Sequence, residues 1–239
     1  MKQLLFIFLI ICPLWALFSC GEFDQSMERD SCVDVIISGS LHVKTDGEPL
    51  SNTPVEVIWF DKGLNFMFYT SYRVVSSNTT NNGDFVFKTK LDTFLFSTHY
   101  LYVRIPFDQE KYVTLLNNRG YGYEQKRFDN FDISAFQNMQ FEFYHKADLT
   151  IYLNRTSDDN FRWISIQHDF AGETYLDGSN YFGITFATTD SLKVRTAAGI
   201  YTKVILTKTA FEEEIELSET LIDSLICTKD GPNSLSFNY

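Results

Sequence analysis

The chain has 239 residues, of which 44% are apolar and 16% aromatic, and its 31 acidic and 20 basic side chains give a net charge of −11. So negative a protein repels phosphate backbones, which argues against nucleic-acid binding. The apolar content is too high for a disordered chain, and 12 glycines with 5 prolines are too few for a fibrous one. This length predicts roughly two folded domains.

Residues 1–19 have the pattern of a signal peptide. Lys2 precedes an apolar run from Leu4 to Leu17 that only Pro13 interrupts. As a helix this run would span about 21 Å, short of a bilayer core of about 30 Å. The run therefore indicates a cleaved signal peptide rather than a permanent membrane span.

The signal peptide ends in Leu17-Phe18-Ser19-Cys20, which resembles the lipobox of bacterial lipoproteins, although Phe18 stands where that family usually has a small residue. The resemblance implies a diacylglycerol on Cys20, cleavage just before it, and acylation of the new amino end with fatty acids such as palmitate. An ordinary secretory signal with an unmodified cysteine is the alternative. Several acyl chains would hold the protein durably on a membrane.

The residues after the cysteine indicate which membrane. Gly21 is not the aspartate that retains many lipoproteins on the inner membrane, so the resemblance implies the outer membrane. Glu22 and Asp24 resemble the export tag of surface lipoproteins in Bacteroidetes-type bacteria, and the periplasmic and cell-surface faces both stay open. The polar segment 20–31 is expected to be a tether between the lipid and the first domain.

Residues 32–116 predict a first β-sandwich. Apolar residues recur at every second position, as expected for half-buried strands, and no segment keeps a helical period. The inward positions are Val33, Val35, Ile37, Leu41 and Val43, then Val55, Val57 and Trp59, then Leu101, Val103 and Ile105. Tyr100, Tyr102 and Arg104 face outward, and Asn82-Gly83 forms a turn that tolerates a positive φ.

The turns of this region resemble those of the carboxypeptidase-regulatory-like module, which has the transthyretin-like sandwich fold. The matching residues are Gly39, Gly47-Glu48-Pro49-Leu50, Pro54-Val55-Glu56-Val57, Asn82-Gly83-Asp84-Phe85-Val86-Phe87 and Tyr102-Val103. The resemblance covers about residues 33–115, roughly a third of the chain. It implies a non-catalytic accessory or adhesion-like module.

A junction and a second sandwich follow. Residues 117–140 lose the alternation but are rich in aromatics, so we expect a packed crossover with a short helical turn. The two-residue period returns in 141–239, and strands every 8–12 residues or so indicate a second, transthyretin-like or Ig-like sandwich. Residues 230–233 predict a hairpin turn. A degenerate tandem repeat is possible, although no residue-level similarity between the halves is visible.

No pattern in the sequence indicates catalysis, a metal site or a cofactor. None of His42, His99, His145 and His168 forms a metal-ligand pair at the spacing of a known motif, and no serine elbow is present. The oxygen-rich stretches 157–160 and 177–180 are expected to be turns rather than calcium sites. The acidic run 212–216 is expected to protect a strand edge. The protein is therefore predicted not to be an enzyme.

Two cysteines remain in the folded part of the chain, Cys32 and Cys227. A disulfide between them is chemically allowed outside the cytoplasm. Their positions at opposite ends of two successive domains favour two small buried side chains instead. Whether they pair stays open.

Aromatic residues are the sharper binding hypothesis. Flat rings suit sugar rings, although most aromatics fill cores. The candidate ligand-binding residues are Phe66, Phe68, Tyr69, Tyr121 and Tyr123. We expect a non-enzymatic, outer-membrane-anchored lipoprotein whose β-sandwiches contact an envelope protein partner; a glycan-binding surface lipoprotein and an adhesin or pilus-type subunit are the alternatives.

Overall fold

A computed structural model describes residues 31–63, 71–115, 122–156, 163–170, 182–185, 191–212 and 215–239. In this part of the chain the ordered elements are β-strands and two short 3-10 helices, η1 (Thr93–Ser97) and η3 (Ile133–Phe136). The protein is an all-β sandwich protein, as the two-residue period predicts. None of the described segments forms an apolar helix of the length needed to cross a bilayer.

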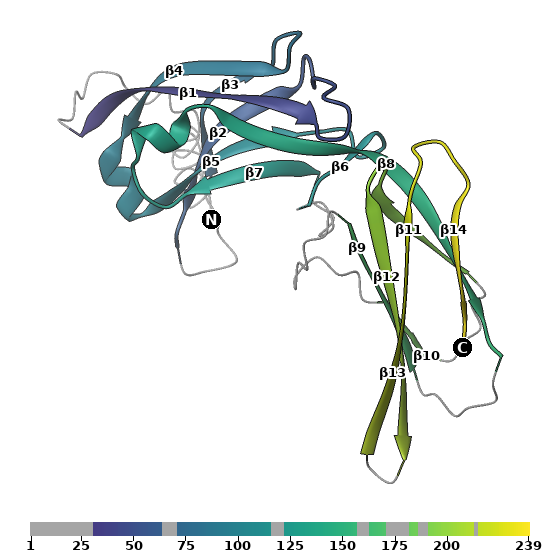
Figure 1. The fold of residues 1–239 in the computed structure, drawn as a ribbon. Helices are drawn as coiled ribbons and strands as arrows, with labels where there is room; N and C mark the ends of the chain where they lie inside the picture. The colour runs from purple at the N-terminus through teal and green to yellow at the C-terminus, as the bar shows by residue number, and fades with distance from the viewer. Residues whose placement is uncertain are drawn as a thin grey trace, which may run out of the picture.

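The first sandwich packs a three-strand layer against a four-strand layer (Figure 1). Its strands are β1 (Cys32–Val43), β2 (Pro54–Asp61), β3 (Ser71–Asn78), β4 (Asp84–Asp92), β5 (His99–Pro106), β7 (Tyr123–Phe128) and the first part of β8 (Met139–Asn154). The sheet orders are β4-β1-β8 and β3-β2-β5-β7. The predicted inward residues of β1, β2 and β5 line the core between the layers, Val33 only at its margin.

Two glycines in this sandwich meet a definite steric demand. A Cβ on Gly39 of β1 would lie 2.4 Å from the carbonyl oxygen of Met139 on β8, so only glycine lets these two strands pair. Gly83, in the turn before β4, has a φ of +79°. This agrees with the positive φ that Asn82-Gly83 predicts, because glycine adopts that region without steric cost.

The segment 117–140 differs from the expected junction. Tyr123–Phe128 is an edge strand, β7, that pairs antiparallel with β5. The expected short helical turn is η3, which buries Phe136 completely beside Phe128 in the first core. Full burial of a phenylalanine stabilises by roughly 2–3 kcal/mol. The described aromatics of the segment therefore belong to the first sandwich, and the chain crosses to the second sandwich further on.

The crossing is made by one uninterrupted strand, β8. Its residues 139–143 pair with β1, and Tyr144 and His145 pair with the two-residue strand β6 (Tyr112–Val113). Residues 146–152 pair with β11 (Ser191–Ala197), and 149–154 pair with β14 (Asn233–Asn238). The last strand of the first sandwich is thus also the first strand of the second, and Figure 1 shows it running across the bend between them.

The second sandwich repeats the strand order of the first. Its sheets have the orders β11-β8-β14 and β10-β9-β12-β13, where β9 is Trp163–Phe170, β10 is Phe182–Thr185, β12 is Tyr201–Glu212 and β13 is Ile215–Ile226. The first and last strands are parallel neighbours in both sandwiches, β1 with β8 and β8 with β14. The halves are a repeat in topology.

The predicted hairpin turn at 230–233 is wrong. β13 and β14 belong to different sheets, so the segment between them is an arch from one layer to the other. Buried Asn233 stabilises this arch, because its amide donates to the carbonyl oxygens of Thr228 and Asp148 and its Oδ1 accepts from Thr228 N.

Candidate functional site

Several predicted site residues lie outside the described residues. These are Cys20, Phe66, Phe68, Tyr69, Tyr121 and the two oxygen-rich stretches 157–160 and 177–180. Of the candidate ligand-binding aromatics, Tyr123 is described. It is half-buried on the edge strand β7.

Tyr123 belongs to an aromatic and cationic surface that we call the Tyr–Arg face. It is the outward side of β2, β5 and β7, because cross-strand partners share a side of the sheet. Its members are Phe60, Tyr100, Tyr102, Arg104, Tyr123 and Arg127. The alternation of β5 predicted that Tyr100, Tyr102 and Arg104 face outward, but it did not show that Tyr123 joins them.

Rings and guanidinium groups on this face lie against one another. The Arg104 guanidinium carbon is 4.4 Å from the Tyr123 ring centre, and that of Arg127 is 4.7 Å from the Tyr100 ring centre. The Tyr102 ring packs edge-on against those of Phe60 and Tyr100 at 5.9 and 6.4 Å. Burial raises the pKa of Tyr102, so its hydroxyl stays protonated at neutral pH. Such a surface can stack on flat rings and donate hydrogen bonds to anions.

A second candidate site lies where β8 leaves the first sandwich. Asp46 and Glu48, in the turn after β1, both approach Nε2 of His145 on β8, with oxygens at 3.0 and 3.3 Å. The Tyr112 ring stacks on the imidazole with ring centres 5.7 Å apart. We call Asp46, Glu48 and His145 the junction cluster. Its three ligand-type atoms all lie within 4.8 Å of one another.

The junction cluster lies beside a shallow groove of about 450 Å³ that Glu48 and Tyr112 help to line. The pKa of Asp46 is lowered, chiefly by the hydrogen bond from the Glu48 backbone and also by His145. The pKa of Tyr112 is raised by burial and then by the negative charges of Glu48, Asp108 and Asp46. Negative charge therefore converges on this corner of the junction.

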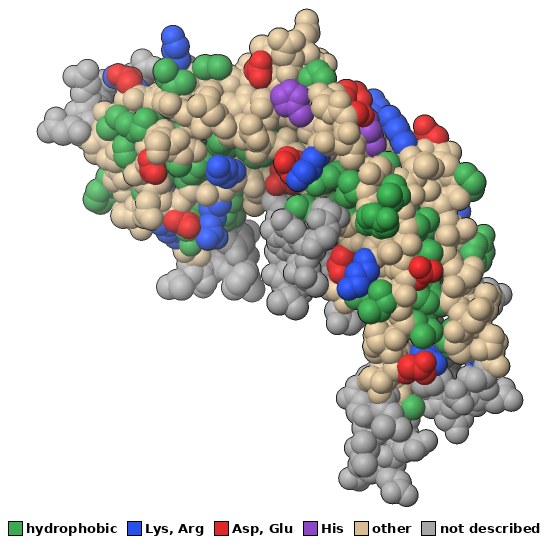
Figure 2. Space-filling model, in the orientation of Figure 1, with side chains coloured by type: hydrophobic (Ala, Val, Ile, Leu, Met, Phe, Trp, Pro, Cys, Tyr) green, Lys and Arg blue, Asp and Glu red, His purple; other side chains and the backbone are tan. Residues whose placement is uncertain are grey.

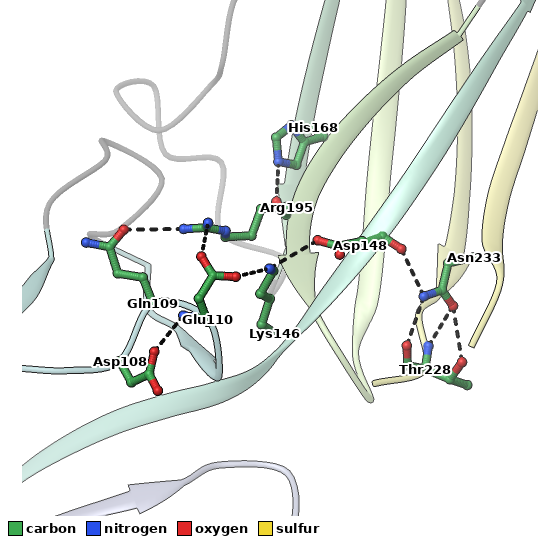
Figure 3. Close-up of polar contacts among 9 residues, drawn as sticks. All are labelled: Asp108, Gln109, Glu110, Lys146, Asp148, His168, Arg195, Thr228 and Asn233. Carbon is green, nitrogen blue, oxygen red and sulfur yellow. Dashed lines mark hydrogen bonds and ion pairs between the residues drawn. The ribbon is translucent and has the colours of Figure 1, made fainter. Parts of the chain in front are cut away.

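Ion pairs join the two sandwiches next to this cluster (Figure 3). Glu110, between β5 and β6, accepts from Lys146 of β8 at 2.9 Å and from Arg195 of β11 at 3.5 Å. Arg195 also donates to Gln109 at 3.3 Å. Figure 2 shows acidic and basic side chains side by side around the bend.

The spacing of the histidines along the chain gave no indication of the junction cluster. Asp46 and Glu48 are two residues apart, but His145 lies about a hundred residues further along the chain, so no sequence spacing marks the three as a group. The signal that brings them together is the parallel register of β1 and β8, in which Val43 lies opposite Phe143. Asp46 and Glu48 follow Val43, and His145 follows Phe143. These residues therefore come together just beyond the last paired residues of β1 and β8.

The other histidines have separate surroundings. His42 is half-buried on β1. His99 is also half-buried and lies against the rings of Trp59 and Tyr72. His168 is fully buried on β9, where Nε2 donates to the carbonyl oxygen of Arg195.

The two described cysteines are both free, Cys32 exposed and Cys227 buried. Of the acidic run 212–216, Glu212 ends β12 and Glu216 lies on β13, which is an edge strand of its sheet.

Comparisons with known proteins give distant likenesses. No family model matches the chain, and no curated protein matches it. The Bacillus anthracis TIE protein is 11% identical with a TM-score of 0.32, over 87% of this chain and 34% of that protein, so this chain spans about a third of its length. The shaft pilin SpaA from Lactobacillus rhamnosus GG is 6% identical with a TM-score of 0.26, over 87% and 98% of the two chains. The Streptococcal ancillary pilin is 9% identical with a TM-score of 0.28, over 86% and 62%. Likenesses at these scores carry no argument about function.

Proposed function

We propose that this chain is a non-enzymatic outer-membrane lipoprotein, anchored by lipid at Cys20, whose two β-sandwiches contact an envelope protein partner. The first sandwich is proposed to be a transthyretin-like module of the carboxypeptidase-regulatory type. The observation that carries the proposal is the continuity of β8, which pairs with strands of both sandwiches from residue 139 to residue 154. Two sandwiches that share a strand form one stiff body, which suits a protein that presents a surface.

The direction of β1 and β8 supports a placement in which the first sandwich is the one nearer to the membrane. β1 begins at Cys32, directly after the tether, and runs parallel to β8. The chain therefore enters the first sandwich at one end and leaves at the other, about 40 Å away for a twelve-residue strand. The tether of residues 20–31 reaches at most about 43 Å. In this arrangement the first sandwich lies near the lipid and the second lies farther out.

The lipid anchor is tested by Cys20→Ala in cells, with Cys32→Ala as the matched control. We expect wild type and Cys32→Ala to fractionate with the outer membrane and to incorporate tritiated palmitate. Cys20→Ala should do neither, because the thiol that accepts the diacylglycerol is lost. Membrane retention and labelling of Cys20→Ala would refute the anchor.

Binding of an anionic glycan is the second candidate function, and the Tyr–Arg face favours it. On this face Arg104 Nε and Gln125 Oε1 are buried cross-strand neighbours, and neither has a hydrogen-bond partner among the described residues. Rings next to guanidinium groups match a sugar that carries carboxylate or sulfate groups.

The glycan candidate is tested by electrophoresis of the native protein through gels that contain polygalacturonate. Retardation that Tyr102→Ala removes and Tyr152→Ala keeps would support it, because Tyr152 is exposed on β8, away from the Tyr–Arg face. Equal migration of all three proteins with and without the polysaccharide would exclude this glycan.

In the adhesin or pilus-type version of the proposal, the partner is another copy of the chain.

A further inference from the structure

We propose that the junction cluster of Asp46, Glu48 and His145 binds one divalent transition-metal cation, with Zn²⁺ the best match. This inference is independent of the lipid anchor and of any partner. It rests on the position of one imidazole nitrogen between two carboxylates at the place where β8 passes from one sandwich to the other.

The distances suit a small cation. Zn²⁺ holds histidine nitrogen and carboxylate oxygen at about 2.0–2.2 Å, so neighbouring ligands in a tetrahedral site lie roughly 3.4 Å apart. The oxygens of Asp46 and Glu48 lie 3.0 and 3.3 Å from Nε2 of His145. A cation can therefore take the place of the proton between them with small side-chain movements.

One histidine with two carboxylates favours Zn²⁺ over Ca²⁺ and Mg²⁺. Ca²⁺ requires six to eight oxygen ligands, and Mg²⁺ prefers oxygen and retained water. Imidazole nitrogen suits Zn²⁺ and its transition-metal neighbours. The structure thus offers three protein ligands and leaves a fourth position for water, as in open zinc sites.

Burial and charge also favour this site. The His145 side chain is 10% exposed and is fixed by the Tyr112 ring, whereas the Asp46 and Glu48 side chains are 49% and 51% exposed, so a cation can enter from solvent. Neither carboxylate pairs with a lysine or arginine in the described part of the chain. One imidazole therefore faces two carboxylates, whereas Asp108, which also lines the groove, is paired with Lys111 at 3.7 Å.

The cation would join two segments directly. Asp46 and Glu48 belong to the turn after β1, and His145 belongs to β8. The carbonyl oxygen of His145 accepts from Ala198 N, next to Gly199, which lies against Thr45 of the same turn. Occupancy would therefore fix the turn after β1 to β8 at a point where the β11–β12 turn of the second sandwich contacts both segments.

The test is calorimetric titration of the mature chain, purified in detergent without a polyhistidine tag, with ZnCl₂. We expect one Zn²⁺ per chain and no binding of CaCl₂ at the same concentration, because imidazole nitrogen suits Zn²⁺ whereas Ca²⁺ requires six to eight oxygen ligands. Co²⁺ should give the visible absorption of a site of low coordination number.

His145→Gln and the exposed-carboxylate variant Glu48→Gln should each weaken Zn²⁺ binding by roughly tenfold or more, since each removes one of three protein ligands. His42→Gln, a half-buried histidine on β1 outside the cluster, should bind like wild type. Glu48→Gln keeps the test decisive if His145→Gln does not fold. No Zn²⁺ binding by the wild type, or equal affinity in wild type and Glu48→Gln, would overturn the proposal.

Discussion

At the scale of single residues, His168 ties stability to pH. It is fully buried on β9, and Nε2 must carry the proton because its partner, the carbonyl oxygen of Arg195, only accepts. Nδ1 is buried and has no hydrogen-bond partner in the described residues. Protonation would place a charge there, and burial of the ring accordingly lowers the pKa of His168.

The sign of the pH effect follows from this lowered pKa. The unfolded histidine has a pKa of about 6.5. Between that value and the lower folded pKa, the unfolded chain binds more protons, so the free energy of unfolding falls as pH falls. We expect the urea midpoint to drop between pH 7.5 and 5.5, because the free energy of unfolding falls by about 1.4 kcal/mol for each unit by which the folded pKa lies below the unfolded one, within this range.

The pH dependence is checked with two variants. His168→Gln keeps a donor for Arg195 but cannot titrate, so its urea midpoint should change little over this range. His42→Gln should retain the wild-type dependence. The same slope in His168→Gln and wild type would show that another group is responsible. The carboxylates with lowered pKa values, such as Asp46 and Glu110, act only at lower pH.

At the scale of elements, β7 shows why alternation can fail as a signal. Phe128 faces the core, but the other inward positions of this strand are Lys126 and Glu124, opposite Val103 and Ile105 of β5. β7 is the edge of its sheet, where Lys126 Nζ reaches the Phe128 ring at 5.7 Å. Burial raises the pKa of Glu124. Polar side chains at inward positions of an edge strand remove the two-residue period from the sequence.

The alternation of β1, β2, β5 and the second half of β8 could be predicted because these strands are central or flank a continuous core. Their inward side chains are apolar, and their outward side chains are polar or aromatic except at Ile36 and Ile58. The repeat between the halves is visible only in strand order. A sandwich core accepts many apolar combinations, so two copies can diverge completely in sequence while their pairing persists.

At the scale of the whole molecule, ion pairs, the shared strand β8 and a small buried apolar cluster of Val113, Tyr144, Phe170 and Ala197 hold the sandwiches together. The ion pairs of Glu110 with Lys146 and Arg195 lie at the surface, where water and salt weaken such pairs. β8 contributes backbone pairing on both sides of the bend, and breaking it would expose unpaired backbone groups. The strand, rather than the ion pairs, is therefore expected to set the relative orientation.

This expectation is checked by small-angle X-ray scattering. Inserting Gly-Gly between Tyr144 and His145 should increase the radius of gyration and the flexibility of the particle, because the second half of β8 shifts by about 7 Å relative to the first. The same insertion between Asn81 and Asn82, in an exposed turn, should leave the scattering curve unchanged, as should Glu110→Gln. An unchanged curve for the β8 insertion would mean that other contacts fix the bend.

The sequence by itself determined the all-β class, the extent of the first apolar strands and the glycine turn before β4, because these depend on local periodicity and backbone conformation. Only the tertiary structure decided that one strand serves both sandwiches, that Tyr123 joins the outward rings of β5, and that Asp46 and Glu48 meet His145. Each of these depends on which strands pair and in which register. That choice is made by contacts between residues far apart in the chain, which no local pattern records.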